Sequence, residues 1–229
     1  MSAGVASGQH AAEGPARGGA SRLLKNPWFL AAVVGILVLT GMRVFTSRRL
    51  NTLPVLGDVA DFTLTDQDGQ PFTRADLNGH VTVVSFIFTT CRTICPAVTA
   101  ANVDLQKRFA AVGAPVRLLS ITVDPEYDTP PVLKAYAEEN GADLATWTFA
   151  TGDRAVLEAL VMGKDGFRLA MGDKTEDAAG VADITHSTKL VLVDRKGQVR
   201  HYFSSSPDER ELVAAYAIDL LTNDDEGGR

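Results

Sequence analysis

The stretch that decides the fold is VTVVSFIFTTCRTICP, residues 81–96. Its first half, Val81 to Phe88, is a nearly continuous run of β-branched and aromatic residues, which is typical of a strand buried on both faces of a sheet. Apolar residues then recur at helical spacing over Val98 to Val112, so the chain passes from a central strand into a helix. The two cysteines, Cys91 and Cys95, lie at this junction.

The sequence around this unit predicts an α/β domain. The other expected elements are a hairpin over 62–65 and 70–73, a buried strand over 116–123, helices over 131–139 and 153–162, a hairpin over 189–194 and 198–203, and a closing helix over 207–221. Residues 164–185 show no clear periodicity and are predicted to form a loop. This order predicts a thioredoxin-like mixed sheet with helices on both faces and an extra N-terminal β-hairpin.

The first fifty residues differ in composition from the rest. Residues 1–25, rich in Gly, Ala and Ser, are predicted to be a disordered tail. Residues 26–45 are predicted to form one transmembrane helix, because the uncharged run from Asn26 to Met42 reaches the lower limit for a membrane span. The run ends in Thr40-Gly41-Met42-Arg43, which makes a poor signal-peptide cleavage site and favours a retained anchor over a cleaved one.

The predicted domain is strongly acidic. The sequence predicts a linker over 46–54, a thioredoxin-like domain over 55–222 and a second disordered tail over 223–229. Six basic side chains and one acidic side chain give residues 1–50 a net charge of +5, so the rest carries −11 within the overall −6. Such a domain repels phosphate backbones, which argues against nucleic acid as a partner.

The cysteine pair is the predicted site of chemistry. Ligands bind beyond the carboxyl ends of strands in open α/β sheets, and a helix N-terminus favours reactive thiolates. If Cys91 and Cys95 are both helical, their Cβ atoms lie about 5–6 Å apart, wider than the roughly 3.5–4.5 Å that a disulfide prefers. Two thiolates on one face can instead share a soft metal such as Cu(I) or Zn(II). The alternatives are a structural disulfide and two cysteines that act as small apolar residues.

A third metal ligand has to come from elsewhere in the chain. His186 is the candidate, because it precedes the strand over 189–194 and this junction is expected beside the start of the cysteine-bearing helix. His10 lies in the tail, His80 at the opposite end of the strand, and His201 within a strand. Two thiolates and one imidazole make a three-coordinate site suited to Cu(I). A zinc site that adds His201 is the alternative.

The residue Asp124 ends the second buried strand at the same predicted edge. It could supply an oxygen to the site, although its simpler role is to open the turn at Asp124-Pro125. The acidic segment over 164–185 could move His186 toward or away from the cysteines, or form a solvated surface.

Three motifs, in this order, resemble the Sco/SenC family. They are Thr90-Cys91-x-x-x-Cys95-Pro96, Val123-Asp124-Pro125-Glu126-x-Asp128-Thr129, and His186-Ser187-Thr188 with Val193-Asp194-x-x-Gly197. The resemblance runs from about Val55 to Leu221 and includes the single anchor. Arg92 is a departure, since many members of the family have proline after the first cysteine.

The resemblance implies a metallochaperone rather than an enzyme, with Cys91, Cys95 and His186 as the ligands of copper, Cu(I) and Cu(II). It implies two partners, a copper donor protein and the cytochrome c oxidase subunit that carries Cu(A), and a role in assembling that centre. The alternative is a thiol–disulfide oxidoreductase with Cys91 and Cys95 as its redox-active pair, or a redox sensor. The expected location is a bacterial inner membrane with the domain facing the periplasm, because the N-terminus makes a poor transit peptide.

Overall fold

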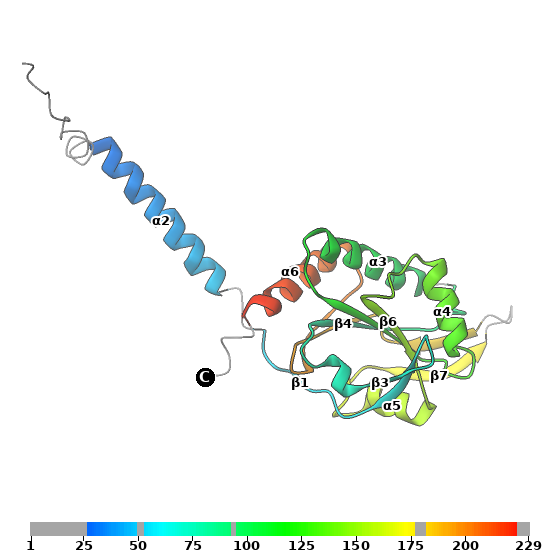
Figure 1. Cartoon of the computed structure of the whole chain (residues 1–229). Helices are drawn as coiled ribbons and strands as arrows, with labels where there is room; N and C mark the ends of the chain where they lie inside the picture. The colour runs from blue at the N-terminus through cyan, green and yellow to red at the C-terminus, as the bar shows by residue number, and fades with distance from the viewer. Residues whose placement is uncertain (1–26, 50–52, 93–94, 177–181, 224–229) are drawn as a thin grey trace, which may run out of the picture. The chain divides into compact units, whose positions relative to one another are not determined.

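The computed structural model describes residues 27–49, 53–92, 95–176 and 182–223 (Figure 1). They belong to two units, one that ends at Thr52 and one that begins at Leu53. The first unit contains the helix α2 (Pro27–Arg49). Its 23 residues make it about 34 Å long at 1.5 Å per residue. The helix begins close to the predicted start and continues beyond the predicted end at residue 45.

Large apolar side chains along α2 are exposed, among them Trp28, Leu37 and Leu39. Across the described ranges, no helix combines the length and the apolar character that crossing a membrane requires. The predicted transmembrane anchor is therefore not confirmed. The predicted tail over 1–25 lies outside the described residues, and so do residues 224–229 of the second predicted tail, whose first residue, Asn223, is the last residue of a helix.

The second unit contains a mixed eight-stranded sheet and a separate two-stranded sheet. The large sheet has the strand order β1-β10-β9-β4-β5-β6-β2-β3, and the small one pairs β7 with β8. The strands of the large sheet are β1 (Gly57–Asp58), β2 (Thr63–Asp66), β3 (Pro71–Thr73), β4 (Thr82–Ile87), β5 (Arg117–Thr122), β6 (Trp147–Thr151), β9 (Leu190–Val193) and β10 (Gln198–Phe203). The small sheet consists of β7 (Met171–Glu176) and β8 (Ala182–His186).

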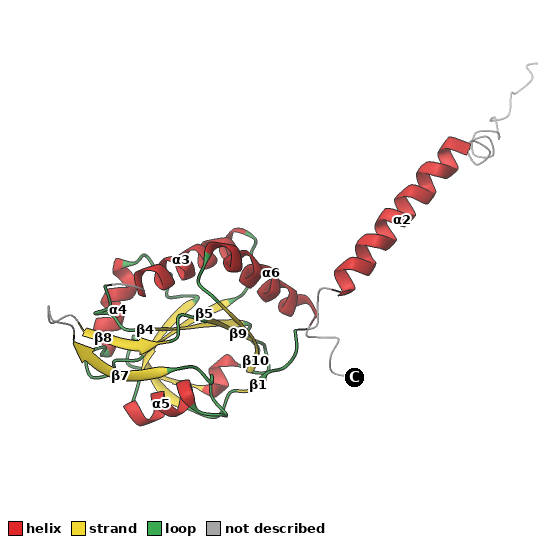
Figure 2. Cartoon of the chain, turned by 180° about the vertical axis from the view of Figure 1, so that it is seen from behind, coloured by secondary structure: helices red, strands yellow, loops and turns green. Residues whose placement is uncertain are grey.

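Helices lie on both faces of the large sheet, as predicted. Figure 2 shows α3 (Cys95–Ala111) and α6 (Pro207–Asn223) side by side on one face and α5 (Arg154–Met162) on the other. Helix α4 (Pro130–Glu139) packs against β6, and the short 3₁₀ helix η1 (Arg74–Leu77) follows β3. The predicted N-terminal hairpin is present as β2 and β3, at the β6 side of the sheet.

The central strand β4 determines where the loops of the domain meet. All six of its side chains are buried. It pairs in parallel with β5, with Val84 opposite Leu119, and in antiparallel with β9, with Val84 opposite Val191. The end of β4, the end of β5 and the start of β9 therefore lie at one edge of the sheet. We call it the cysteine edge, because Cys91 follows β4 there.

Two parts of the predicted order were wrong or incomplete. Strand β6 lies between β5 and β2 and was not predicted, because its sequence WTFAT has no regular alternation. The segment over 164–185, predicted to be a loop, contains β7 and most of β8. These strands pair with each other outside the large sheet, so they need few apolar side chains, and Ile184 is the one in β8 that is described as buried.

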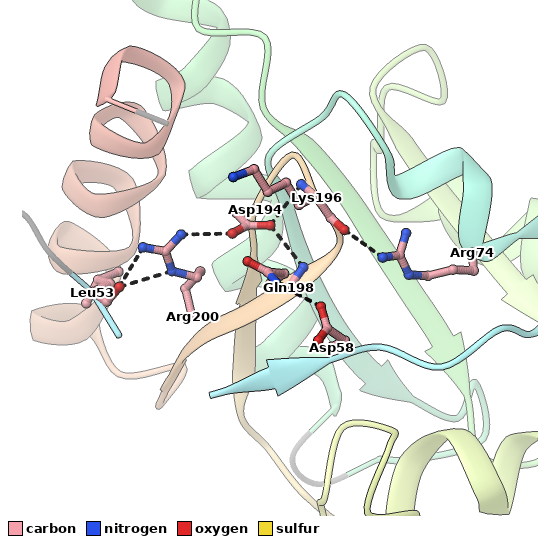
Figure 3. Close-up of polar contacts among 7 residues, drawn as sticks. All are labelled: Leu53, Asp58, Arg74, Asp194, Lys196, Gln198 and Arg200. Carbon is pink, nitrogen blue, oxygen red and sulfur yellow. Dashed lines mark hydrogen bonds and ion pairs between the residues drawn. The ribbon is translucent and has the colours of Figure 1, made fainter. Parts of the chain in front are cut away.

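At the opposite end of the sheet, an ion pair holds the start of the domain (Figure 3). Arg200 Nη1 lies 2.8 Å from Asp194 Oδ2, and Arg200 Nε and Nη2 donate to the carbonyl oxygen of Leu53 at 3.1 and 2.5 Å. The other Asp194 oxygen accepts the backbone N–H groups of Lys196 and Gln198, both at 2.9 Å. The β9–β10 turn and the beginning of the domain are therefore tied together.

The packing of α3 and α6 allows a matched test of the core. Leu105 on α3 is 0% exposed, whereas Leu212 on α6 is 48% exposed. Leu105→Ala is expected to lower the free energy of unfolding by about 2–5 kcal/mol, because it removes buried methyl groups and leaves a cavity. Leu212→Ala is expected to change it by less than about 0.5 kcal/mol. Urea denaturation of both variants measures the difference, and equal losses would contradict this packing.

Candidate metal centre

The first cysteine is held by a tight turn at the end of β4. The backbone N–H of Cys91 donates to the carbonyl oxygen of Phe88 at 3.2 Å, which closes a turn over Phe88–Cys91. Cys91 lies before α3, and Cys95 is the first residue of that helix. The sequence alone left open whether both cysteines are helical. Residues 93–94 lie outside the described residues.

Both cysteines are thiols in this structure and point into the protein. Cys91 is 7% exposed and Cys95 is 0% exposed. The backbone N–H of Cys95 donates to Cys91 Sγ at 3.4 Å. The N–H groups of a first helical turn carry partial positive charge, so the Cys91 sulfur faces the positive end of α3. The pair is accessible chiefly from the side of Cys91.

Burial controls the protonation of the second cysteine. It raises the pKa of the Cys95 thiol well above its usual range, because the thiolate loses its hydration. A backbone hydrogen bond from Phe88 lowers this pKa, and the nearby carboxylate of Asp128 raises it further. Cys95 is therefore a neutral thiol at pH 7 in the metal-free protein. A metal ion that binds its sulfur has to displace a proton.

The loop after β5 is hydrogen-bonded to the turn over Phe88–Cys91, which we call the cysteine turn. Asp128 is fully buried, and its Oδ2 accepts the backbone N–H of Thr89 at 3.1 Å. Its carboxylate also accepts the hydroxyl groups of Thr89 and Thr122. Burial raises the pKa of Asp128, while these hydroxyl groups lower it. Asp128 had no predicted role, because an acidic residue between Tyr127 and Thr129 gives no sign in the sequence of being buried.

The backbone of Asp124 opens the turn that precedes Asp128. Its carbonyl oxygen accepts the N–H groups of Tyr127 at 3.2 Å and Asp128 at 2.9 Å, and its own N–H donates to Thr122 Oγ1 at 3.0 Å. Asp124 therefore shapes the β5–α4 turn, the simpler of the two roles considered from the sequence, and the supply of an oxygen to the site stays a prediction. Its side chain is buried at the cysteine edge.

Strand β8 brings the backbone of His186 toward the cysteine edge. His186 is the last residue of β8 and pairs with Met171. Because β9 starts at Leu190 and runs antiparallel to β4, the chain just before it lies toward the end of β4. The side chain of His186 lies outside the described set. Among the side chains that are described, no group of three His, Cys, Asp or Glu residues is arranged for a metal ion. Ligation by His186 stays a prediction.

The position of His201 argues against the zinc site that was the alternative. His201 pairs with Leu192 within the β10–β9 ladder, and Leu192 pairs with Val83 of β4. Val83 precedes Phe88 by about 16 Å of strand, at roughly 3.3 Å per residue. The ring of His201 also packs against that of Phe203, with centroids 4.4 Å apart. His201 is therefore an ordinary strand residue away from the cysteine edge.

The remaining candidates lie elsewhere. His80 precedes β4 at the opposite end of the sheet, where its N–H donates to the carbonyl oxygen of Leu77 at 3.2 Å. His10 lies outside the described residues. Arg92, the departure from the family pattern, is exposed directly after Cys91 and places a positive charge beside the more accessible thiol.

Comparison with known proteins settles the family. Residues 57–218 match the family model described as SCO1/SenC. The chain belongs to the SCO1/SenC family. The SCO1 protein homolog of Bacillus subtilis (strain 168) is 36% identical to this SCO1/SenC protein over 147 residues, which cover 64% of this chain and 73% of the homolog.

Two solved structures share the fold. Bradyrhizobium japonicum ScoI with copper bound is 26% identical, with a TM-score of 0.60 over 70% of this chain and 98% of ScoI. BsSco, a member of the Sco family of cytochrome c oxidase assembly proteins with an identified disulfide switch, is 30% identical, with a TM-score of 0.60 over 73% of this chain and 97% of BsSco. The thioredoxin-like fold expected for a SCO1/SenC protein is confirmed.

The raised pKa of Cys95 predicts unequal reactivity of the two thiols. In a Cys91→Ser variant, which leaves only Cys95, alkylation by iodoacetamide is expected to stay slow at pH 8 and to rise only above the usual titration range of a thiol, because the thiolate is the nucleophile. The Cys95→Ser variant is the control, and its Cys91 is expected to react faster. Mass spectrometry of the alkylated protein at several pH values gives both rates. Equal rates at pH 8 would contradict the role of burial.

Proposed function

We propose that this protein carries copper and assists assembly of the Cu(A) centre of cytochrome c oxidase. The observation behind the proposal is the pair of buried thiols at one sheet edge, with the Cys95 N–H 3.4 Å from Cys91 Sγ. Thiolate sulfur is a soft ligand that selects Cu(I). Copper bound to ScoI and the membership of BsSco in a family of oxidase assembly proteins support the same function.

The proposed copper ligands are Cys91, Cys95 and His186. The two sulfurs come from one turn and the helix that follows it, and the His186 backbone reaches the same edge. Burial makes a bare thiolate at Cys95 unfavourable. A Cu(I) ion bound to the Cys95 sulfur would offset that negative charge, so the site stabilises the metal-bound thiolate more than the metal-free one. The imidazole nitrogen also suits Cu(II), which extends the site to both oxidation states.

Transfer to a partner is proposed to begin at Cys91. This residue is 7% exposed, whereas Cys95 is fully buried. An incoming ligand from the copper donor protein, or from the oxidase subunit that carries Cu(A), therefore meets Cys91 first. The acidic charge of residues 51–229, −11, favours partners with a basic surface around their copper ligands.

A second candidate function is thiol–disulfide exchange with the cysteines of a partner, or redox sensing. Cys91 lies before α3 and is not constrained to helical spacing from Cys95, which makes a reversible disulfide between them accessible. The disulfide switch of BsSco favours this possibility. The same two residues then serve as the redox-active pair, and copper carriage and thiol reduction can occur in one protein.

We also propose that α2 anchors the protein in a bacterial inner membrane, with the domain on the periplasmic side. The helix is about 34 Å long, which matches the roughly 30 Å hydrocarbon core of a bilayer. Large apolar side chains along the described part of α2 are exposed, among them Leu37 and Leu39, and a lipid environment removes such surface from water.

Copper binding is tested by anaerobic Cu(I) titration of the reduced full chain in detergent against a competing chelator. The wild-type protein is expected to bind one equivalent tightly, Cys91→Ser and Cys95→Ser to lose tight binding, and His186→Ala to bind at least about tenfold more weakly, because each removes one of three ligands. His201→Ala is the matched control and is expected to keep wild-type affinity. Unchanged affinity in His186→Ala would overturn the three-ligand site.

The anchor is tested by comparing the full chain with residues 51–229 after expression in bacteria. The full chain is expected in the membrane pellet and the shorter chain in the soluble fraction, since only the first carries the apolar helix. Immunoblotting of both fractions gives the distribution. Recovery of the full chain in the soluble fraction would reject membrane anchoring.

A further inference from the structure

The buried carboxylate of Asp128 connects the two loops of the cysteine edge. It accepts the backbone N–H and the hydroxyl of Thr89 on one side and the hydroxyl of Thr122 on the other. We propose that Asp128 is a positioning residue that holds Cys91 in the arrangement that receives a metal ion and opposes its closure onto Cys95. The proposal deepens the proposed function and rests on it only for its copper measurement.

The cysteine turn is held at two points. The backbone N–H of Cys91 donates to the carbonyl oxygen of Phe88 at 3.2 Å, and this hydrogen bond closes the turn itself. Thr89, the second residue of that turn, donates its N–H and its hydroxyl to the Asp128 carboxylate, and these hydrogen bonds attach the turn to the rest of the domain. Without the second point the turn can pivot about the end of β4, and the position of Cys91 Sγ over the first N–H of α3 is lost.

The residue Asp128 is itself firmly placed. Its backbone N–H donates to the carbonyl oxygen of Asp124 at 2.9 Å, and Thr122 Oγ1 accepts the N–H of Asp124 at 3.0 Å while donating its own proton to Asp128. An ionised carboxylate is an acceptor only, so it suits a site where every contacting group is a donor. Helix α4 begins at Pro130, directly after this turn, and adds a rigid support.

The hold on Thr89 acts against disulfide formation. A disulfide prefers Cβ atoms about 3.5–4.5 Å apart, so oxidation of the pair draws Cys91 toward α3 and pulls on the turn. In that step an S–S bond forms as the two thiols give up two electrons and two protons to an oxidant such as a small-molecule disulfide. Asp128 resists this movement, and its removal is expected to make the disulfide easier to form.

The test uses Asp128→Ala in the full chain, with Ser120→Ala as the matched control. Ser120 is also fully buried in β5, and its hydroxyl lies 2.9 Å from Ser85 Oγ and accepts Trp147 Nε1–H at 3.0 Å. Both variants therefore lose buried hydrogen bonds, but only the first touches the cysteine turn. Two quantities are measured for each: the thiol–disulfide equilibrium of the Cys91–Cys95 pair in dithiothreitol redox buffers without copper, and the Cu(I) affinity. Thermal unfolding checks that both variants are folded.

The expected result is specific to the turn. Asp128→Ala is expected to shift the equilibrium toward the disulfide by about tenfold, a reduction potential lower by about 30 mV, and to weaken Cu(I) binding by about tenfold. Ser120→Ala is expected to keep both values within about twofold. Wild-type values in a folded Asp128→Ala protein would overturn the proposal, and so would equal shifts in both variants, since these would show only a general loss of stability.

If Asp128→Ala does not fold, Thr89→Val is the second test, because it removes the hydroxyl that donates to Asp128 and keeps the size of the side chain. A shift of the thiol–disulfide equilibrium by about threefold toward the disulfide would support the proposal, and an unchanged equilibrium would reject it. If the wild-type protein fails to bind Cu(I), the proposed copper function fails. The redox equilibrium, measured without metal, still tests Asp128.

Discussion

The burial of β4 on both faces and its pairing along both edges is the constraint on which the site depends. Its six side chains are all buried, and it is paired with β5 on one side and β9 on the other. A strand held in this way has no freedom to slide, because a shift of one residue would turn its side chains to the opposite faces. The residues that follow β4 therefore have a fixed position at the cysteine edge. The loop after β4, the loop after β5 and the segment before β9 meet there, although they lie far apart in the sequence.

The same burial sets the electrostatic character of the cysteine edge. It raises the pKa of Cys95 and that of Asp128, because neither anion is hydrated inside the protein. A metal cation that bonds to the sulfurs would offset the free-energy cost of a buried thiolate at this edge. A soft cation satisfies the sulfurs, and the hydroxyl groups of Thr89 and Thr122 already satisfy the carboxylate.

Much of this architecture could be predicted from the pattern of apolar residues. The strands β4 and β5 are nearly continuous apolar runs, as strands buried on both faces require. The helix α3 has apolar residues at helical spacing, so it too could be recognised from local sequence. Strand β6 and the ribbon of β7 and β8 could not be predicted, because β6 mixes threonine with aromatic residues and the ribbon pairs only with itself, outside the large sheet. Tertiary pairing, rather than local pattern, makes these segments strands.

The site was predictable to a similar degree. The strand-to-helix junction located Cys91 and Cys95, because that position follows from local pattern alone. The contact of Asp128 with Thr89 joins positions 39 residues apart and depends on the parallel register of β4 and β5. No local spacing encodes such a contact. The order of β8 and β9 brings the backbone of His186 to the same edge for the same reason.

The bond between Arg200 and Leu53 bears on where the domain begins. The family match starts at residue 57, which would suggest that the preceding residues are dispensable. Yet the carbonyl oxygen of Leu53 receives two N–H groups of a guanidinium that is itself paired with the buried Asp194. A chain that lacks Leu53 would lose these two hydrogen bonds beside a side chain that is only 13% exposed. The contacts of the domain thus extend four residues before the start of the family match, and they end there on a single main-chain oxygen.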